Sequence, residues 1–343
     1  MLAAVLEDVR KMVLKDIPRP RPGRGETLVR IKACGICLTD YCAYTGARTN
    51  WKPGQIVGHE MSGVLEEVGE GVESFGPGDE VIVSPAIFCG QCEHCKSGLQ
   101  HYCPNGAVIG GEGFENVLPG GFAEFVKAPV QTLYLKPPNI SFPAAALTEP
   151  LAGSYKGLIS YTQLTVGEDV VIIGAGAMGL LLTQIAHAAG AGNLILIDIA
   201  DYKLDYARKC GASHTINSTK QDPGKAVAAI LPRGPDIVFE AAGALEAAEL
   251  AFALCRRGTR INMFGVIVPG TVPVSPATLH FSETRMDASF SVTPRVMLKA
   301  IELMRKGLVD TSKIITHQVP LQEIQKALDI MGTVERIKVV VLP

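Results

Sequence analysis

The sequence has almost no net charge and no block of like charges. Its 343 residues include 32 Lys and Arg against 34 Asp and Glu, which leaves a formal net charge of −2. Because the protein has no large net positive charge, it has little electrostatic attraction for nucleic acid or for an anionic membrane surface. It also has no internal repeat and no low-complexity segment. We therefore expect a small-molecule partner, no nucleic acid and no membrane.

The sequence also lacks the features of a secretion signal and of a membrane span. Charged residues are spread through residues 1–16, MLAAVLEDVRKMVLKD, which leaves no apolar core for a signal peptide. Residues 170–197 contain no Asp, Glu, Lys or Arg and are long enough to cross a bilayer. Five glycines, Gln184, His187 and Asn193 interrupt that stretch, however, so we expect it not to span a membrane. The expected location is cytoplasmic.

The cysteine content does not fit a disulfide scaffold, because the nine cysteines are odd in number and four of them crowd into residues 89–103. Metal binding in a reducing compartment explains this clustering better. In CGQCEHCKSGLQHYC, four thiolates can fill the tetrahedral shell of Zn²⁺ and leave no open position, which predicts a structural zinc. The alternatives are an iron–sulfur cluster and unligated core cysteines. We expect His94 and His101 to be solvated loop residues, and the predicted ligands are Cys89, Cys92, Cys95 and Cys103.

A glycine-rich turn between apolar runs predicts a dinucleotide site. Residues 170–173 suit a buried parallel strand, and residues 180–189 have the length and composition of a helix. Between them, Gly174, Gly176 and Gly179 form G-x-G-x-x-G, which permits a tight turn, close approach of a pyrophosphate, and packing of helix on strand. A second strand, residues 194–197, ends in Asp198, nineteen residues after the last glycine. An acid there meets the ribose hydroxyls of NAD and repels the extra phosphate of NADP.

The pattern of the sequence changes near residue 153. Residues 1 to about 150 contain short β-like runs, at 27–32, 63–68 and 80–84, which predict an irregular, mostly antiparallel β domain. The later part alternates apolar strands with helices through VVIIGAG, NLILID, DIVFEAAG and TRINMFG, as in a doubly wound parallel sheet. Helices are predicted at residues 295–306 and 321–331. Residues 338–342 form a closing strand without a helix partner, so we expect it to return to the first domain.

A second group of candidate metal ligands is scattered over the first domain. A mixed shell of Cys, His and carboxylate with room for water is typical of catalytic zinc. From the residues alone the alternative stays open, because a cysteine or a single histidine here could equally be an ordinary buried residue. The group consists of Cys34, Cys37, Thr39 and Asp40 in CGICLTD, His59 and Glu60 in GHE, and Glu149 in TEPLAG.

These motifs, in this order, resemble a known family. CGICLTD, GHEMSGVLEEVGEGVESFGPGDEV, the four-cysteine stretch, GAGAMG and ITHQVPLQEIQKALDIM closely resemble the zinc-containing medium-chain alcohol dehydrogenases, particularly the polyol (sorbitol-like) and threonine dehydrogenase branch. The resemblance implies an α/β protein with a GroES-like β-rich catalytic domain and a Rossmann doubly wound parallel-sheet domain. It places the catalytic domain at residues 1–152, completed by 288–343, and the NAD-binding domain at residues 153–287.

The resemblance also implies roles for single residues near the metal. Cys37, His59 and Glu60 match the ligands of the catalytic zinc, and Glu149 matches the nearby acid that reaches the metal directly or through water. Thr39 matches the hydroxyl of the proton relay.

Two further matches concern the cofactor and the proton path. Lys203 matches a basic residue that touches the adenosine ribose, although a solvated helix lysine explains it equally well. Many relatives have a relay histidine where this chain has Cys42, so protons leaving Thr39 need another route here. Members of this branch are commonly tetramers, and we expect a homo-oligomer, either tetramer or dimer.

Together these assignments predict an NAD-dependent zinc alcohol dehydrogenase. It would reversibly oxidise a secondary alcohol of the polyol, diol or amino alcohol class to a ketone, with hydride transfer to NAD. One zinc per chain would be catalytic, as a Lewis acid, and one structural. The alternatives are a zinc-independent NAD(P)H quinone or enoyl reductase of the same superfamily, which needs neither ligand set, and a non-catalytic zinc-ribbon interaction protein, which predicts a basic surface and no dinucleotide fingerprint.

Overall fold

The computed structural model describes residues 1–47, 51–267 and 270–343. The chain divides into two compact units. The first comprises Met1–Glu149, Ser291–Arg305 and Ile315–Pro343, and the second comprises Pro150–Phe290 and Lys306–Ile314. Within the described ranges, no helix is both long and apolar enough to cross a membrane.

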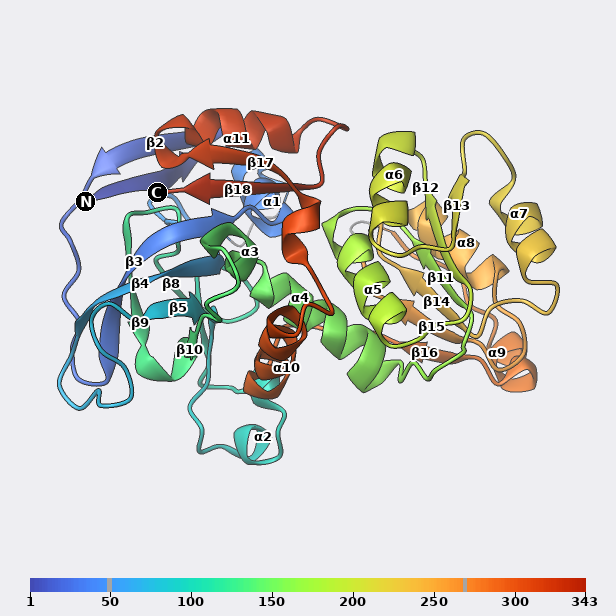
Figure 1. Ribbon diagram of the computed structural model, residues 1–343, viewed down its shortest axis with the longest axis horizontal. Helices are drawn as coiled ribbons and strands as arrows, with labels where there is room; N and C mark the ends of the chain where they lie inside the picture. The colour runs from blue at the N-terminus through green and yellow to red at the C-terminus, as the bar shows by residue number, and fades with distance from the viewer. Residues whose placement is uncertain (48–50, 268–269) are drawn as a thin grey trace. The chain divides into compact units, whose positions relative to one another are not determined.

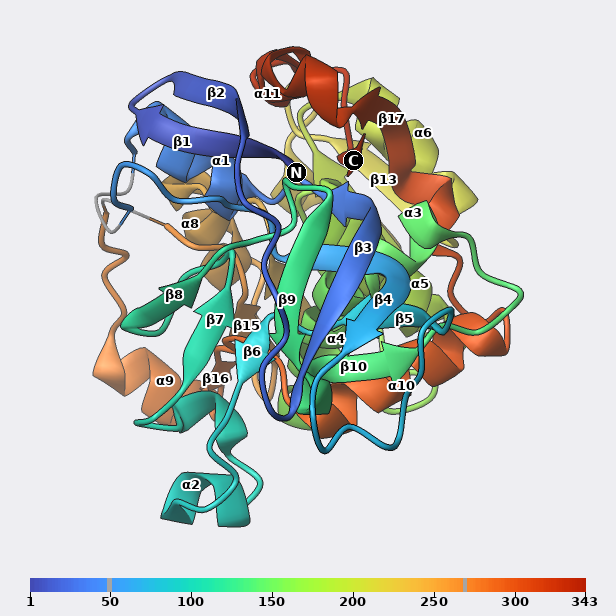
Figure 2. The ribbon, with the colours of Figure 1, turned by 90° about the vertical axis from the view of Figure 1, so that its left-hand side faces the viewer.

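The first unit is built around a seven-stranded, mostly antiparallel sheet. Its strands follow the order β10-β5-β4-β3-β18-β17, and β9 also pairs with β3. Figure 2 shows β9, β3 and β4 side by side. Along β3, buried Val29 and Ile31 alternate with exposed Arg30 and Lys32, as expected for a strand with one face in the core. The strands are β3 (Glu26–Gly35), β4 (Glu60–Val68), β5 (Glu80–Val83), β9 (Phe125–Pro129), β10 (Leu133–Leu135), β17 (Ile315–Pro320) and β18 (Lys338–Leu342).

The closing strand β18 lies between β17 and β3. It runs parallel to β17 and antiparallel to β3, with Val341 opposite Cys34. Val339, Val340 and Val341 are fully buried. The predicted return of residues 338–342 to the first part of the chain is therefore confirmed.

Smaller elements surround this sheet. Residues 321–331, predicted as one helix, begin as a 3-10 turn, Leu321–Glu323, and become α-helical only from Ile324. The strands are β1 (Leu2–Asp8), β2 (Lys11–Asp16), β6 (Ala86–Ile87), β7 (Ala107–Ile109) and β8 (Asn116–Leu118). The helices are α1 (Leu38–Thr45), α2 (Glu93–Lys96), α3 (Phe142–Ala146), α10 (Pro294–Arg305) and α11 (Ile324–Met331), and α4 (Thr148–Tyr155) carries the chain into the second unit.

The second unit contains a six-stranded sheet in which all paired strands are parallel (Figure 1). The strand order is β13-β12-β11-β14-β15-β16, so the chain builds the sheet outward in one direction from β11 and then in the other from β14. In such sheets nucleotides bind at the carboxyl ends of the strands where the order changes. The strands are β11 (Val170–Ile173), β12 (Leu194–Asp198), β13 (His214–Asn217), β14 (Ile237–Glu240), β15 (Arg260–Met263) and β16 (Arg285–Asp287).

Helices connect these strands. The predicted strand at residues 170–173 coincides with β11, whereas the helix predicted at 180–189 begins earlier, at Ala177, because Gly176 is its N-cap. The helices are α5 (Ala177–Ala188), α6 (Asp201–Lys209), α7 (Pro223–Ile230), α8 (Leu245–Ala253) and α9 (Pro276–Ser282), and a π-helical segment, Lys156–Tyr161, follows α4.

Candidate active site

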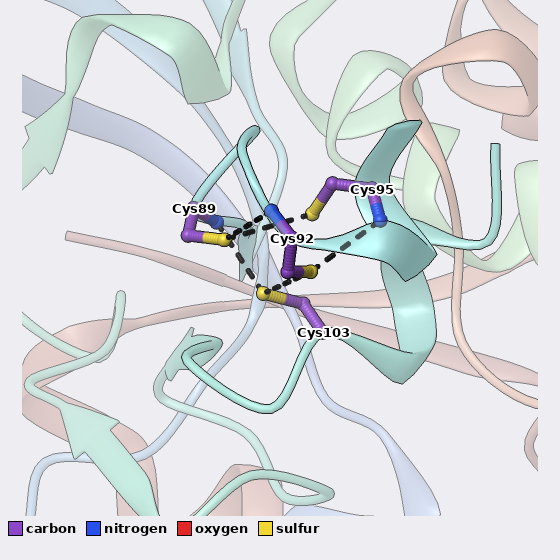
Figure 3. Close-up of side chains that lie close together, drawn as sticks. All are labelled: Cys89, Cys92, Cys95 and Cys103. Atoms are coloured by element: carbon purple, nitrogen blue, oxygen red, sulfur yellow. Dashed lines mark hydrogen bonds between the residues drawn. The ribbon is translucent and has the colours of Figure 1, made fainter. Parts of the chain in front are cut away.

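The four clustered cysteines converge on one point. Figure 3 shows their sulfur atoms turned toward one another. Cys89 Sγ lies 4.0 Å from Cys95 Sγ, and Cys92 Sγ lies 3.9 Å from Cys103 Sγ. In a tetrahedral shell with Zn–S bonds of about 2.3 Å, sulfurs lie about 3.8 Å apart. The four thiols therefore fit a zinc ion, and none of the nine cysteines, all within the described ranges, forms a disulfide.

The environment of these thiols differs around the cluster. Backbone N–H groups of Gln91 and Cys92 lower the pKa of the Cys89 thiol to about 6, which favours the thiolate that a metal requires. Burial raises the pKa of the Cys95 thiol to about 12. A bound cation would offset the free-energy cost of ionising this buried thiol, because it stabilises the thiolate form.

The two histidines of this lobe, residues 89–103, are placed differently. His94 is exposed, as expected. The expectation that His101 is solvated is wrong, because His101 is only 4% exposed and its ring lies 4.0 Å from that of Tyr102. His101 is the buried residue of the 3-10 turn Gln100–Tyr102, whose Tyr102 is exposed.

A second cluster brings together Cys37, His59 and Glu60. One potential ligand atom from each lies within 4.8 Å of those of the other two. Cys37 is the N-cap of α1, and Glu60 is the first residue of β4. Because β3 and β4 pair with Gly35 opposite Glu60, two motifs that are separate in the sequence, CGICLTD and GHE, meet at one end of the sheet.

Asp40 holds two of these residues in place. Its Oδ2 accepts a hydrogen bond from the Cys37 N–H at 2.8 Å, and its Oδ1 accepts one from the Gly58 N–H at 3.1 Å. Oδ1 also lies 3.5 Å from His59 Nδ1. Burial alone would lower the pKa of His59, but Asp40 and Cys37 outweigh it and raise that pKa well above its usual range. Such support of a ligand histidine is common around metals.

Glu60 has a partner that the sequence analysis missed. Lys338 Nζ donates to Glu60 Oε1 at 2.5 Å and to the Ile36 carbonyl at 2.9 Å, and both side chains are buried. Glu60 Oε2 has no hydrogen-bond partner among the described residues, and a Cβ at Gly35 would collide with it. A buried carboxylate oxygen without a partner fits a bound cation. The sequence offered one signal for this partner: Lys338 is the only charged residue in the otherwise apolar strand β18.

Glu149 and Thr39 lie close to this cluster in the fold. Glu149, in the first turn of α4, is not among the three residues grouped within 4.8 Å. Burial raises its pKa to about 7, and His59, Glu60 and Lys338 all influence it electrostatically. Thr39 lies in the first turn of α1 and is half-buried, and Cys42 lies on the same helix.

The glycine-rich turn has the shape of a dinucleotide cradle. Gly174 has φ +103, and a Cβ there would lie 2.7 Å from the Ala242 nitrogen. A Cβ at Gly179 would collide with the Gly174 carbonyl oxygen, whereas one at Gly176 would meet no described atom within 4 Å. Gly176 thus leaves space for a ligand at the N-terminus of α5.

Asp198 ends β12 beside this turn. Its Oδ2 accepts from the Ala175 N–H at 2.7 Å, and its Oδ1 accepts from the Ala200 N–H at 3.0 Å. The carboxylate therefore has a fixed orientation, and it is half-buried. Lys203 lies in the first turn of the following helix, α6, and is also half-buried.

A cavity of about 670 Å³ lies beside Gly111, and its lining includes none of Cys37, His59 and Glu60. Gly111 itself lies against His59, since a Cβ on this glycine would be 3.5 Å from His59 Cγ. The lining mixes polar residues such as Gln55 and Asn116 with apolar ones such as Trp51 and Phe114.

Comparison with known proteins places these features in context. Residues 23–138 match the family model "Alcohol dehydrogenase GroES-like domain", and residues 177–306 match "Zinc-binding dehydrogenase". The chain is 32% identical to the sorbitol dehydrogenase of Bacillus subtilis (strain 168), over 100% of this chain and 97% of the relative. It is also 32% identical to the L-threonine 3-dehydrogenase of that strain, over 96% and 95%.

Solved structures show the same similarity. Alcohol dehydrogenase TADH from Thermus sp. ATN1 is 31% identical, with a TM-score of 0.91 over 100% of this chain and 99% of that one. A protein described as a zinc-binding dehydrogenase from Sinorhizobium meliloti 1021, bound to NADP, is 30% identical, with a TM-score of 0.92 over the same shares.

Proposed function

Because the chain belongs to the zinc-containing medium-chain alcohol dehydrogenases, we propose that Cys37, His59 and Glu60 bind its catalytic zinc. The family membership confirms the predicted resemblance and the α/β fold of a GroES-like and a Rossmann domain. The chain is accordingly an oxidoreductase that acts on CH–OH groups of a small molecule with zinc and NAD(P). The observation that carries the metal assignment is the convergence of three ligand types, one of them a carboxylate whose Oε2 has no partner among the described residues.

The reaction is the reversible oxidation of a secondary alcohol to a ketone. When bound, zinc supplies a Lewis acid for the substrate oxygen and NAD accepts the hydride. Thr39, two residues after Cys37 on α1, offers a hydroxyl that would accept the proton of the substrate hydroxyl while its own proton passes on to water or to the cofactor ribose. Glu149, whose pKa is raised by burial, would reach the same metal directly or through water.

We assign NAD rather than NADP as the cofactor. The carboxylate of Asp198 is fixed at the end of β12 by two backbone N–H groups, where it would accept from ribose hydroxyls and repel a 2′-phosphate. Gly174, Gly176 and Gly179 make the pyrophosphate cradle, and Lys203 lies on the next helix.

We assign a second, structural zinc to the lobe of residues 89–103. Four sulfurs at tetrahedral spacing leave no position for substrate, so this ion would stabilise structure only. A polyol, a diol or an amino alcohol is the proposed substrate class, because the relatives at 32% identity include a sorbitol dehydrogenase and an L-threonine 3-dehydrogenase. We further propose a cytoplasmic homo-oligomer, either a tetramer or a dimer.

Metal content and turnover test this function together. We expect two zinc ions per chain by atomic spectroscopy, and reduction of NAD faster than NADP with at least one alcohol from a panel of polyols, diols and amino alcohols. Cys37→Ser should lose one zinc and nearly all turnover, because a ligand is removed. Cys255→Ser is the matched control, since that thiol donates to the Ala251 carbonyl and a serine hydroxyl can do the same.

Other results would exclude the proposal. One zinc per chain with turnover retained in Cys37→Ser would indicate a zinc-independent reductase. Preference for NADP would refute the role of Asp198.

A further inference from the structure

Strand β14 ends in a buried carboxylate that the proposed chemistry does not use. Glu240 is 0% exposed and lies opposite Ile173, the last residue of β11. Its Oε1 accepts hydrogen bonds from the Ala242 N–H at 2.8 Å and the Gly243 N–H at 2.7 Å. Its Oε2 has no hydrogen-bond partner among the described residues. Burying a carboxylate is costly, and the two bonds to Oε1 offset part of that cost while they hold the N–H groups of Ala242 and Gly243 in place.

The segment that Glu240 holds lies directly against the glycine-rich turn. A Cβ at Gly174 would lie 2.7 Å from the nitrogen and 2.9 Å from the Cα of Ala242. The Ala241 N–H donates to the Ile173 carbonyl at 2.8 Å. Residues 241–243 therefore form one wall of the Gly174 turn, and any movement of that wall moves the turn.

Asp198 restrains the opposite side of the same turn. It accepts from the Ala175 N–H at 2.7 Å, at the end of the neighbouring strand β12. Two acids, one at the end of each strand flanking β11, thus fix this turn from both sides. Asp198 is expected to accept hydrogen bonds from the ribose of the cofactor. Glu240 is fully buried, so we assign it no direct contact with the cofactor.

Space for the Glu240 carboxylate depends on Gly265. A Cβ at Gly265 would collide with Glu240 Oε2 and would lie 2.5 Å from the Gly243 nitrogen. Gly265 has no positive φ, so alanine is compatible with its backbone. Substitution there would displace the carboxylate without removing its charge.

We propose that Glu240 is a positioning residue for the dinucleotide, holding residues 241–243 so that the glycine-rich turn is formed before the pyrophosphate binds. The inference rests on the proposed NAD-linked function. A preformed turn loses less conformational freedom on binding, so its loss weakens affinity more than it slows the hydride step.

The test compares two variants with a matched control. Glu240→Met removes the oxygen that accepts from the Ala242 and Gly243 N–H groups at a similar side-chain volume, and Gly265→Ala displaces the carboxylate. Both should raise the Kd and KM for NAD roughly tenfold with kcat changed less than about twofold. The control is Glu168→Gln in the same unit, which removes an ion pair with Arg260 before β11 starts and should leave the NAD affinity unchanged.

Hydrogen exchange of the protein without NAD gives a second readout. The amides of Ala242 and Gly243 should exchange faster in Glu240→Met, and slow exchange there together with unchanged NAD affinity would overturn the inference. Equal losses of NAD affinity in Glu240→Met and Glu168→Gln would reduce Glu240 to a general structural residue and overturn it as well. Failure of the unaltered chain to bind NAD would instead refute the proposed function, and this inference with it.

Discussion

At the scale of single residues, the buried ion pair of Glu60 and Lys338 is the most consequential interaction of the candidate metal site. In the absence of metal, Lys338 is the cation next to Glu60, and Asp40 adds a second buried carboxylate nearby. Removing one member of such a pair leaves an uncompensated buried charge, which costs about 3 to 5 kcal/mol. A bound metal ion would supply positive charge in its place.

This leads to a prediction for Lys338→Met. The substitution should lower the melting temperature strongly in chelator and much less with zinc, because zinc compensates Glu60. Differential scanning fluorimetry under both conditions measures this. Lys338→Arg keeps the charge and serves as the control. A loss of stability that zinc does not reduce would show that Glu60 is not a metal ligand.

The sequence identified much of this site, but not its supporting residues. Cys37, His59 and Glu60 carry recognisable ligand chemistry in short motifs, and the structure brings them together. Lys338 lies 278 positions from Glu60 in the chain and reaches it only because β18 pairs with β3. A contact that depends on strand order cannot be read from local spacing. The buried His101 was misjudged for a similar reason, since neighbours in one short turn differ in burial: His101 is 4% exposed and Tyr102 52%.

At the scale of elements, long apolar runs were the most predictable features. β11 and β18 coincide with their predicted residues because their β-branched runs are bounded by Gly174 and Pro343. Helix ends were less predictable, since capping decides them: α5 starts at Ala177 after the Gly176 N-cap. The 3-10 turn that opens residues 321–331 also has no signature in the hydrophobic periodicity.

The cysteine lobe, the proposed site of the structural zinc, contains little regular structure. Its helix α2 has four residues, and its 3-10 turn has three. Cys92 and Cys95 N–H groups donate to the sulfurs of Cys89 and Cys92, so the backbone is organised around the thiols themselves. Without a cation, little else would hold this loop together.

We therefore predict that Cys89→Ser releases one zinc and makes residues 89–103 sensitive to limited proteolysis. Mass spectrometry of the fragments locates the cuts, and atomic spectroscopy counts the zinc. His94→Ala is the control, because His94 is exposed in the same lobe and should retain both zinc ions and resistance. Resistance of metal-depleted Cys89→Ser to the protease would contradict a structural role for the ion.

At the scale of the whole molecule, the second unit has an open sheet edge. β16 is the last strand of the six-stranded sheet, and no strand in the described part of the chain pairs with its outer side. Nearby apolar side chains are exposed, with Phe281 at 73% and Met286 at 53%. An exposed edge strand with apolar neighbours favours pairing with another chain, and a second copy related by a two-fold axis can pair isologously.

The proposed homo-oligomer, if it pairs through β16, makes a direct prediction for Met286→Lys. A lysine on an edge strand opposes pairing, because its charge must be desolvated in the interface. Sedimentation velocity should show the unaltered chain as a dimer or tetramer and Met286→Lys as a smaller species. Val334→Lys, at an exposed apolar residue of the first unit, is the control and should leave the mass unchanged. An unaltered chain that sediments as a monomer would refute the oligomer, whereas an oligomer retained in Met286→Lys would exclude β16 as its interface.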